Sequence, residues 1–363
     1  MKKSLIALAV LASAGVASAQ SSVTLFGIVD ATLQRVSNSG GASVTRLHNS
    51  GYNSSRLGFR GTEDLGGGMS ASFWLEAGVS NDNGSGQATN TNNQASGGNA
   101  APAGTQGLTF NRRSTVSLAG GWGEVRLGRD YSPQFWNLTV FDPFGTVGVG
   151  TTQTLNSSRG GPTIVRASNS FGYFLPGNLG GFYGQLQHYR GENASNSTVA
   201  GTTVGNSSDG NGTGVRVGYA NGPANAAIAY TTTKFAAGDI KSANIGGQWD
   251  FGVAKLMGHY SRDRVSNVAT GKGYLIGGLV PVGPGEIRLA YSQYKDDTAG
   301  TPKAKKLALG YVHNLSKRTA LYATYARVTN SGGSAQSAFP GAAGAPSANS
   351  RSNGYDFGVR HSF

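Results

Sequence analysis

The side chains of this sequence that could take part in chemistry are its charged residues, and their spacing does not suit catalysis. The five histidines are isolated, without the spacing of metal ligands: His48, His188, His259, His313 and His361. There is no Walker loop and no Gly-x-Ser-x-Gly elbow. Residues 212–214 and 271–273 begin like dinucleotide fingerprints, but in each the third glycine comes one residue late. We therefore expect no enzyme and no cofactor.

Arginines recur instead at alternate positions of strand-like segments. Arg56 and Arg60 flank Leu57 and Phe59, and Arg126 lies between two aliphatic residues in the same way. In an extended strand, successive side chains point to opposite faces. If the apolar residues face one medium, the arginines therefore line a polar surface on the other side, where they would act as fixed charges.

The period of two runs from residue 22 to residue 363, and no helix is expected between them. It is clearest in the last ten residues, where one face carries Tyr355, Phe357, Val359, His361 and Phe363 and the other carries Asp356, Gly358, Arg360 and Ser362. An aromatic strand left at a sheet edge would invite aggregation, and closure of the sheet removes the edge. We predict that this strand closes a β-barrel that is apolar outside and wet inside.

The connections between strands are of two kinds that alternate. Seven are tight and rich in Gly, Asn, Asp and Pro, at residues 64–68, 119–123, 176–180, 221–223, 250–252, 281–285 and 314–317. The others are loops, the longest at residues 80–109, 131–166, 192–211 and 329–353. Seven turns and eight loops predict sixteen antiparallel strands. Short turns on one rim and long loops on the other are typical of outer-membrane barrels.

Residues 1–19 have the features of a secretory signal peptide: a basic start, a short apolar run and the small residues Ala17-Ser18-Ala19 before Gln20. Removing 19 of the 363 residues leaves 344, and the net charge of +13 falls by two, to +11, because Lys2 and Lys3 leave. The remaining chain, 20–363, forms the predicted barrel.

Three other classes fit the composition less well. A soluble β-sandwich needs a larger apolar fraction than the 38% present, and a β-helix would show a fixed repeat. The basic charge suits nucleic acid, but Lys and Arg are scattered singly and form no basic tail, so no nucleic-acid partner is expected. A membrane barrel fits because only alternate residues need to face lipid.

Several segments resemble the general porins of Gram-negative outer membranes, in the form common among β-proteobacteria. The resemblance covers the whole mature chain, and its most specific segment is Ser55-Arg-Leu-Gly-Phe-Arg-Gly-Thr-Glu-Asp-Leu-Gly66; the others are residues 22–30, 110–113, 128–131 and the terminal Phe363. It implies a sixteen-stranded homotrimeric barrel in the outer membrane, reached through the periplasm, that passes small hydrophilic solutes. It also implies that Phe363 marks the chain for the barrel-assembly machinery.

The resemblance further implies that the third long loop, residues 131–166, folds into the lumen as a constriction. The residues themselves favour this, because Phe135, Trp136, Phe141 and Phe144 need a surface to pack on, whereas the other long loops are mostly Gly, Ser, Asn and Thr. The alternative is an outer lid over the barrel mouth.

Eight charged residues are candidates for the constriction. Strand parity directs Arg56, Arg60, Glu76 and Arg126 inward, the family pattern favours Arg112 over Arg113, and the third loop adds Asp142, Arg159 and Arg166. Each arginine has an alternative role in a salt bridge that fastens the loop. A further alternative is that some of the basic residues bind the phosphates of lipopolysaccharide. Lipopolysaccharide and membrane lipid are both expected partners.

The basic excess predicts a channel with weak anion preference. A substrate-specific channel for anions or sugars stays open as an alternative, because the sequence alone does not show whether a dense ladder of binding residues lines the lumen. A barrel enzyme is the less favoured third possibility.

Overall fold

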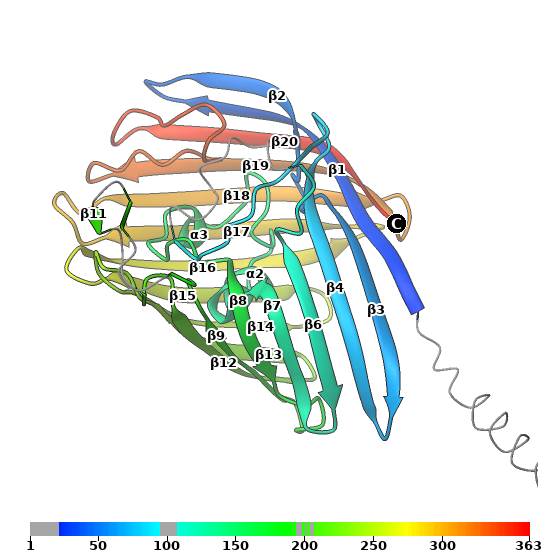
Figure 1. The fold of residues 1–363 in the computed structure, drawn as a ribbon. Helices are drawn as coiled ribbons and strands as arrows, with labels where there is room; N and C mark the ends of the chain where they lie inside the picture. The colour runs from blue at the N-terminus through cyan, green and yellow to red at the C-terminus, as the bar shows by residue number, and fades with distance from the viewer. Residues whose placement is uncertain (1–21, 95–106, 194–197, 200–201, 204–206) are drawn as a thin grey trace, which may run out of the picture.

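The computed structural model describes residues 22–94, 107–193, 198–199, 202–203 and 207–363. The predicted signal peptide, residues 1–19, lies outside the described residues. Within the described chain, sixteen antiparallel strands form a closed barrel (Figure 1): β1 (Ser22–Asn38), β3 (Arg56–Gly66), β4 (Met69–Ser80), β6 (Arg113–Gly120), β7 (Gly123–Tyr131), β8 (Arg166–Phe174), β9 (Phe182–Tyr189), β12 (Gly212–Asn221), β13 (Ala224–Thr233), β14 (Ile240–Asp250), β15 (Lys255–Val265), β16 (Ala269–Val282), β17 (Gly285–Asp296), β18 (Lys303–Asn314), β19 (Thr319–Ser331) and β20 (Arg351–Ser362). The predicted architecture is confirmed.

The barrel closes where the last strand meets the first. β20 pairs with β1 from Ile28↔Ser362 to Asn38↔Ser352. Phe363 extends this pairing, because its backbone N–H and C=O exchange hydrogen bonds of 3.1 Å with those of Gly27. Residues 22–28 of β1 pair with β3, and residues 31–37 of β1 pair with the loop strand β2 (Ser43–Asn49). Further short strands lie in the loops: β5 (Ser85–Gly86), β10 (Thr198–Val199) and β11 (Thr202–Thr203).

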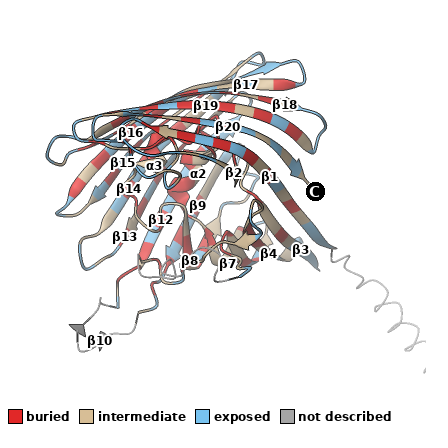
Figure 2. Cartoon of the chain, turned by 90° about the horizontal axis from the view of Figure 1, so that it is seen from above, coloured by how far each residue is buried: buried red, intermediate tan, exposed pale blue. Residues whose placement is uncertain are grey.

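Burial alternates along the strands, as Figure 2 shows in bands along β18, β19 and β20. In β20, Phe357 is 56% exposed, whereas the neighbouring Asp356 is 0% exposed. Phe26 is an apolar residue on the inner face of β1, where its ring lies over Gly58 and against Trp74, with 4.9 Å between the ring centroids. The barrel thus presents an apolar outer wall and a polar inner wall, with local aromatic patches inside.

All seven tight turns join strands at one rim. The loops at the other rim differ in length. Residues 39–55, 81–112, 132–165, 190–211 and 332–350 form long connections, whereas residues 234–239, 266–268 and 297–302 are short. The wall from β13 to β18 therefore ends in short loops at the outer rim.

The third loop lies inside the barrel, in agreement with the inward fold. It contains two short helices, α2 (Pro133–Val140) and α3 (Gln153–Asn156), so the expectation of no helix was wrong here (Figure 1). A segment inside a closed sheet meets no strand edge, and helical turns pair its backbone groups locally. Pro133 suits the first turn of α2, where its missing N–H leaves no hydrogen bond unmade. Among the described residues, no helix is both long enough and apolar enough to cross a membrane.

Glycines on the inner wall provide the surface on which this loop packs. A Cβ added at Gly246 would clash with the ring of Phe141. Gly277, Gly310 and Gly354 lie in the same way beneath Pro143, Phe144 and Val149, with added-Cβ distances of 2.8, 3.1 and 2.8 Å. Phe144 and Val149 then form a buried apolar cluster with small and aliphatic wall residues, namely Leu275, Ala290, Ala308 and Ala326.

Polar contacts fasten the same loop to the wall. Asn137 of α2 donates to the carbonyl of Ala227 at 3.1 Å and to Asn244 Oδ1 at 2.9 Å. The buried ammonium group of Lys306 on β18 donates to the carbonyls of Val149, Thr151 and Ala338, at 3.0, 2.8 and 2.9 Å. Lys306 thereby ties the third loop to the last long loop.

We predict that Gly246→Val weakens the attachment of the third loop, because the new side chain occupies the space of the Phe141 ring. Overpacking of this kind costs about 1–3 kcal/mol. The temperature at which the folded, faster-migrating band disappears in detergent gels should fall. Gly247→Val is the matched control, because Gly247 faces outward and an added Cβ there makes only ordinary contacts, the nearest at 3.4 Å. Equal temperatures for the two variants would contradict this packing.

Candidate functional site

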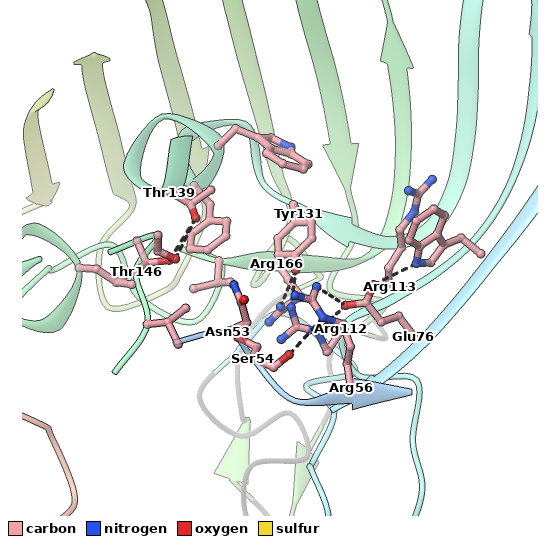
Figure 3. A pocket seen from close by; sticks show the side chains of 17 residues that line it. Asn53, Ser54, Arg56, Glu76, Arg112, Arg113, Tyr131, Thr139, Thr146 and Arg166 are labelled. Atoms are coloured by element: carbon pink, nitrogen blue, oxygen red, sulfur yellow. Dashed lines mark hydrogen bonds and ion pairs between the residues drawn. The ribbon is translucent and has the colours of Figure 1, made fainter. Parts of the chain in front are cut away.

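A cavity of about 520 Å³ lies in the lumen between the third loop and the wall formed by β3 to β8. Figure 3 shows arginines gathered on the wall side, with Thr139 and Thr146 of the loop across from them. The lining residues are Asn53, Ser54, Arg56, Trp74, Glu76, Arg112, Arg113, Tyr131, Phe135, Trp136, Thr139, Gly145, Thr146, Val147, Leu155, Val165 and Arg166. Four of the eight residues expected at the constriction are therefore brought together here: Arg56, Glu76, Arg112 and Arg166.

Glu76 is the one carboxylate in this lining, and it is fully engaged. It forms ion pairs with Arg112 and, at 3.3 Å, with Arg56, and it accepts a hydrogen bond of 3.1 Å from the indole N–H of Trp74. Its side chain is only 4% exposed. Because one carboxylate serves two guanidinium groups, the pair of arginines keeps a net positive charge.

Tyr131 holds two arginines at the base of the third loop. Its hydroxyl accepts hydrogen bonds from Arg112 and Arg166, at 2.8 and 3.0 Å, and the Arg166 guanidinium lies 4.5 Å from the centre of its ring. Tyr131 ends β7, Arg166 begins β8, and the two residues pair in register. The ring also stacks on Phe135 of α2. The two ends of the loop thus fix the charges that face the cavity.

Arg113 also lines the cavity, although the family pattern favoured Arg112 alone. β6 begins at Arg113, so Arg112 lies in the preceding bend and is not bound by strand alternation. The Arg113 guanidinium lies 4.6 Å from the centre of the Trp74 ring and 3.9 Å from Asp130. The sequence indicated this inward position, because Arg113 lies on the same face of the strand as the polar residue Thr115.

The first loop contributes Asn53 and Ser54, which sequence reasoning missed. Residues 50–55 bend into the lumen because Asp30 of β1 accepts the backbone N–H groups of Gly51, Tyr52 and Asn53, at 3.3, 2.9 and 2.6 Å. The alternation of polar and apolar residues in β1 indicated that Asp30 faces inward. The same alternation gave no sign that Asp30 would bind the backbone of the first loop.

Arg60 and Arg126 face inward on the wall but do not line the cavity. The Arg60 guanidinium lies over the rings of Phe26 and Trp74, at 5.4 and 5.2 Å from their centres. Arg126 forms ion pairs with Glu124 and Asp130, at 2.9 and 2.6 Å. Their inward direction agrees with the strand parity, and both belong to the wall nearer the tight turns.

Asp142 and Arg159, which were expected at the constriction, do not line this cavity. Asp142 is buried within the loop, where it accepts the backbone N–H groups of Phe144 and Thr146 at 2.9 and 3.3 Å. Arg159 forms an ion pair with Asp296 at the end of β17. Both therefore fasten the loop, which was the alternative role for Arg159. The part of the cavity lining that the third loop contributes contains no charged residue. The lining therefore has no acidic side opposite the arginines of the wall.

The cavity lining contains four guanidinium groups and one carboxylate, an excess of three positive charges. Stacking on aromatic rings and hydrogen bonds hold these groups in place, so they act as fixed charges. Low-dielectric walls around a water-filled passage focus their field. Among the described residues, no group of three or more His, Asp and Glu side chains is placed to hold a metal ion.

Comparison with known proteins gives a consistent answer. The family model described as Gram-negative porin matches residues 4–333. Outer membrane porin protein 32 of Delftia acidovorans is 41% identical over the full length of both chains, and an outer membrane porin of Bordetella pertussis is 30% identical over 89% of this chain and 93% of its own. The solved structure of an anion-selective porin from Comamonas acidovorans superposes with a TM-score of 0.80, at 37% identity, covering 94% of this chain and all of that chain.

Asp142 predicts a pH dependence of stability. Burial raises the pKa of its carboxyl from 3.8 to about 6, so the folded protein holds this proton more tightly than the unfolded chain. The stabilisation that results is fully present below pH about 4 and is lost as the pH rises through about 6. The unfolding temperature of the wild type, measured relative to that of Asp142→Asn at each pH, should therefore fall between those limits. Parallel curves for the two proteins would contradict the assignment.

Proposed function

This chain belongs to the Gram-negative porin family, and from that premise we propose that the arginine-lined cavity is the constriction of its channel and gives it a weak preference for anions. The protein is an outer-membrane porin, a water-filled channel for ions and small hydrophilic solutes. Its signal peptide, residues 1–19, directs export through the periplasm. We assign it no catalytic activity and no cofactor.

The observation that carries this proposal is the charge of the cavity lining. Arg56, Arg112, Arg113 and Arg166 face one passage with a single carboxylate, and the loop opposite is uncharged. Fixed charge of one sign concentrates counter-ions and excludes co-ions. The name of the Comamonas acidovorans relative, an anion-selective porin, supports the same direction. The preference is weak because Glu76 offsets part of the charge.

The functional unit that we propose is a homotrimer, on the basis of family membership. The mass of the purified protein in detergent, measured by light scattering with the detergent contribution subtracted, should equal three chains. A mass of one chain under conditions that preserve the folded barrel would contradict a stable trimer.

The selectivity proposal predicts the effect of Arg56→Ser. The wild type should pass chloride more readily than potassium across a KCl gradient, and the variant should lower this preference by roughly a factor of two, because one fixed cation leaves the constriction. The difference should shrink in concentrated salt, since the Debye length falls from about 10 Å at 0.1 M to about 3 Å at 1 M. Reversal potentials in planar bilayers measure both effects.

Arg327→Ser is the matched control, because Arg327 is exposed on the outer face of β19. It should leave the reversal potential unchanged. A clear cation preference of the wild type would contradict the proposal. Saturable block of chloride current by one anion class would instead favour the alternative of a substrate-specific channel.

A further prediction concerns Phe363, the proposed signal for the barrel-assembly machinery. Its backbone pairs with Gly27, and its ring lies against that glycine at the point where the barrel closes. Deletion of Phe363 should lower the amount of folded protein in the outer membrane severalfold, while the conductance of the channels that do assemble stays close to that of the wild type. Phe363→Tyr should assemble normally, since the aromatic ring is kept. Equal surface amounts of the deletion variant and the wild type would refute the role.

A further inference from the structure

The third loop turns apolar side chains toward the cavity as well as toward the wall. Those that pack on the glycines of the wall are buried, as at Phe141, Phe144 and Val149. Those that line the cavity are only partly buried: Trp136, Val147, Leu155 and Val165. We call these four residues the apolar side of the cavity. It lies inside the barrel, so contact with membrane lipid does not account for it.

The threonines of the loop add little polar character to this side. Thr139 donates a hydrogen bond of 3.1 Å to the carbonyl of Gly145, and Thr146 donates one of 3.3 Å to the hydroxyl oxygen of Thr139. Both threonines line the cavity, but their hydroxyl protons are used within the loop. The third loop therefore offers a passing solute mainly apolar surface, which favours contact with an apolar group over contact with water.

The arginines of the wall keep N–H groups that the chain itself does not use. Arg56 donates through Nε to a backbone carbonyl and through Nη1 to Glu76. Arg112 donates through Nε to Glu76 and through Nη2 to the Tyr131 hydroxyl, and Arg166 donates through Nη2 to the same hydroxyl. Within the described part of the chain, Nη2 of Arg56 and Nη1 of both Arg112 and Arg166 have no hydrogen-bond partner. Guanidinium groups bind carboxylates through such N–H groups, often two at a time.

Tyr131 joins the charged and the apolar sides of the cavity (Figure 3). Its hydroxyl group holds Arg112 and Arg166, and the centre of its ring lies 5.1 Å from that of Trp136, in an edge-on contact. The unused N–H groups and the apolar side are thus separated by about the length of one aromatic ring. A solute of that size can reach both.

The cavity as a whole has the properties of a small-molecule site. Such sites enclose roughly 300–1,000 Å³, are mostly apolar, and hold a few polar groups that fix the orientation of the ligand. This cavity has a volume of about 520 Å³ and combines an apolar side with a cluster of guanidinium groups. Chloride uses the guanidinium groups alone, so a preference for anions does not account for the apolar side.

We propose that the channel favours carboxylates that carry an apolar body of about one ring, such as benzoate, over carboxylates without one. The carboxylate group binds at Arg56, Arg112 and Arg166, and the apolar body lies against Trp136 and Leu155. The contact is weak enough for the solute to leave again, as conduction requires, so it ranks anions without making the channel specific for one of them. The inference rests on the proposed function, because it takes the cavity as the path of the solute.

The test is a reversal potential between two carboxylates. A planar bilayer with the wild type separates equal concentrations of potassium benzoate and potassium acetate at neutral pH, so potassium has no gradient and the sign of the potential shows which anion crosses more readily. A pore that sorts only by size favours acetate. Benzoate should instead be favoured about threefold, because burial of apolar surface equal to about two methylene groups raises its occupancy about tenfold, while the larger ion diffuses more slowly. Gluconate, a carboxylate with a hydrophilic body, should cross less readily than acetate.

The variant Val147→Thr/Leu155→Asn removes apolar surface from the cavity and keeps every arginine. The preference for benzoate should be lost in this variant, so that acetate crosses more readily. The matched control is Leu179→Asn/Val253→Thr, which places the same side chains at exposed positions in two tight turns. It should favour benzoate as the wild type does. Heat-modifiable migration establishes that each barrel is folded.

Three results would overturn the proposal. They are a wild type that favours acetate over benzoate, a wild type that passes gluconate as readily as benzoate, and a folded Val147→Thr/Leu155→Asn variant that keeps the full preference for benzoate. The comparison of solutes needs only the wild type, so it decides the matter even where the variant does not fold. Failure of the proposed function is seen separately, as a preference for cations in a KCl gradient, whereas an anion-preferring wild type that favours acetate contradicts this inference alone.

Discussion

The attachment of the third loop to the inner wall is the interaction on which the rest of the pore depends. The loop can lie against the wall only because the wall has glycines at the positions that its aromatic rings and prolines contact. Gly246 beneath Phe141 is one example. Lys306 of β18 then binds two carbonyl groups of this loop and one of the last long loop. With the loop held in this way, a cavity remains between the loop and the wall of β3 to β8, where the arginines lie.

The attachment also decides the charge of the passage. The charged residues of the loop are used to fasten it: Asp142 accepts backbone N–H groups within its own turn, and Arg159 pairs with Asp296. The face of the loop that remains for the solute is therefore polar or apolar but uncharged. The charged residues that line the cavity all come from one wall, and Glu76 reduces their positive charge without cancelling it.

The sequence was sufficient for the barrel because a period of two, tight turns and an aromatic last strand are local signals. Strand parity also directed Arg56, Arg60, Glu76 and Arg126 inward. It could not resolve residues outside regular strands: Arg112 precedes β6, and Asn53 reaches the cavity only because Asp30 holds its loop. Which loop charges face the solute depends on partners distant in the chain, such as Asp296 for Arg159, and alternation carries no information about such pairs.

The central claim is that the constriction carries an excess of fixed positive charge. Its most direct test is a pair of crystals of the protein, one soaked in bromide and the other in rubidium, with anomalous scattering used to locate each ion. The account predicts bromide in the cavity beside Arg56, Arg112, Arg113 and Arg166, and no rubidium there. Rubidium in that cavity, with bromide found only elsewhere, would contradict it.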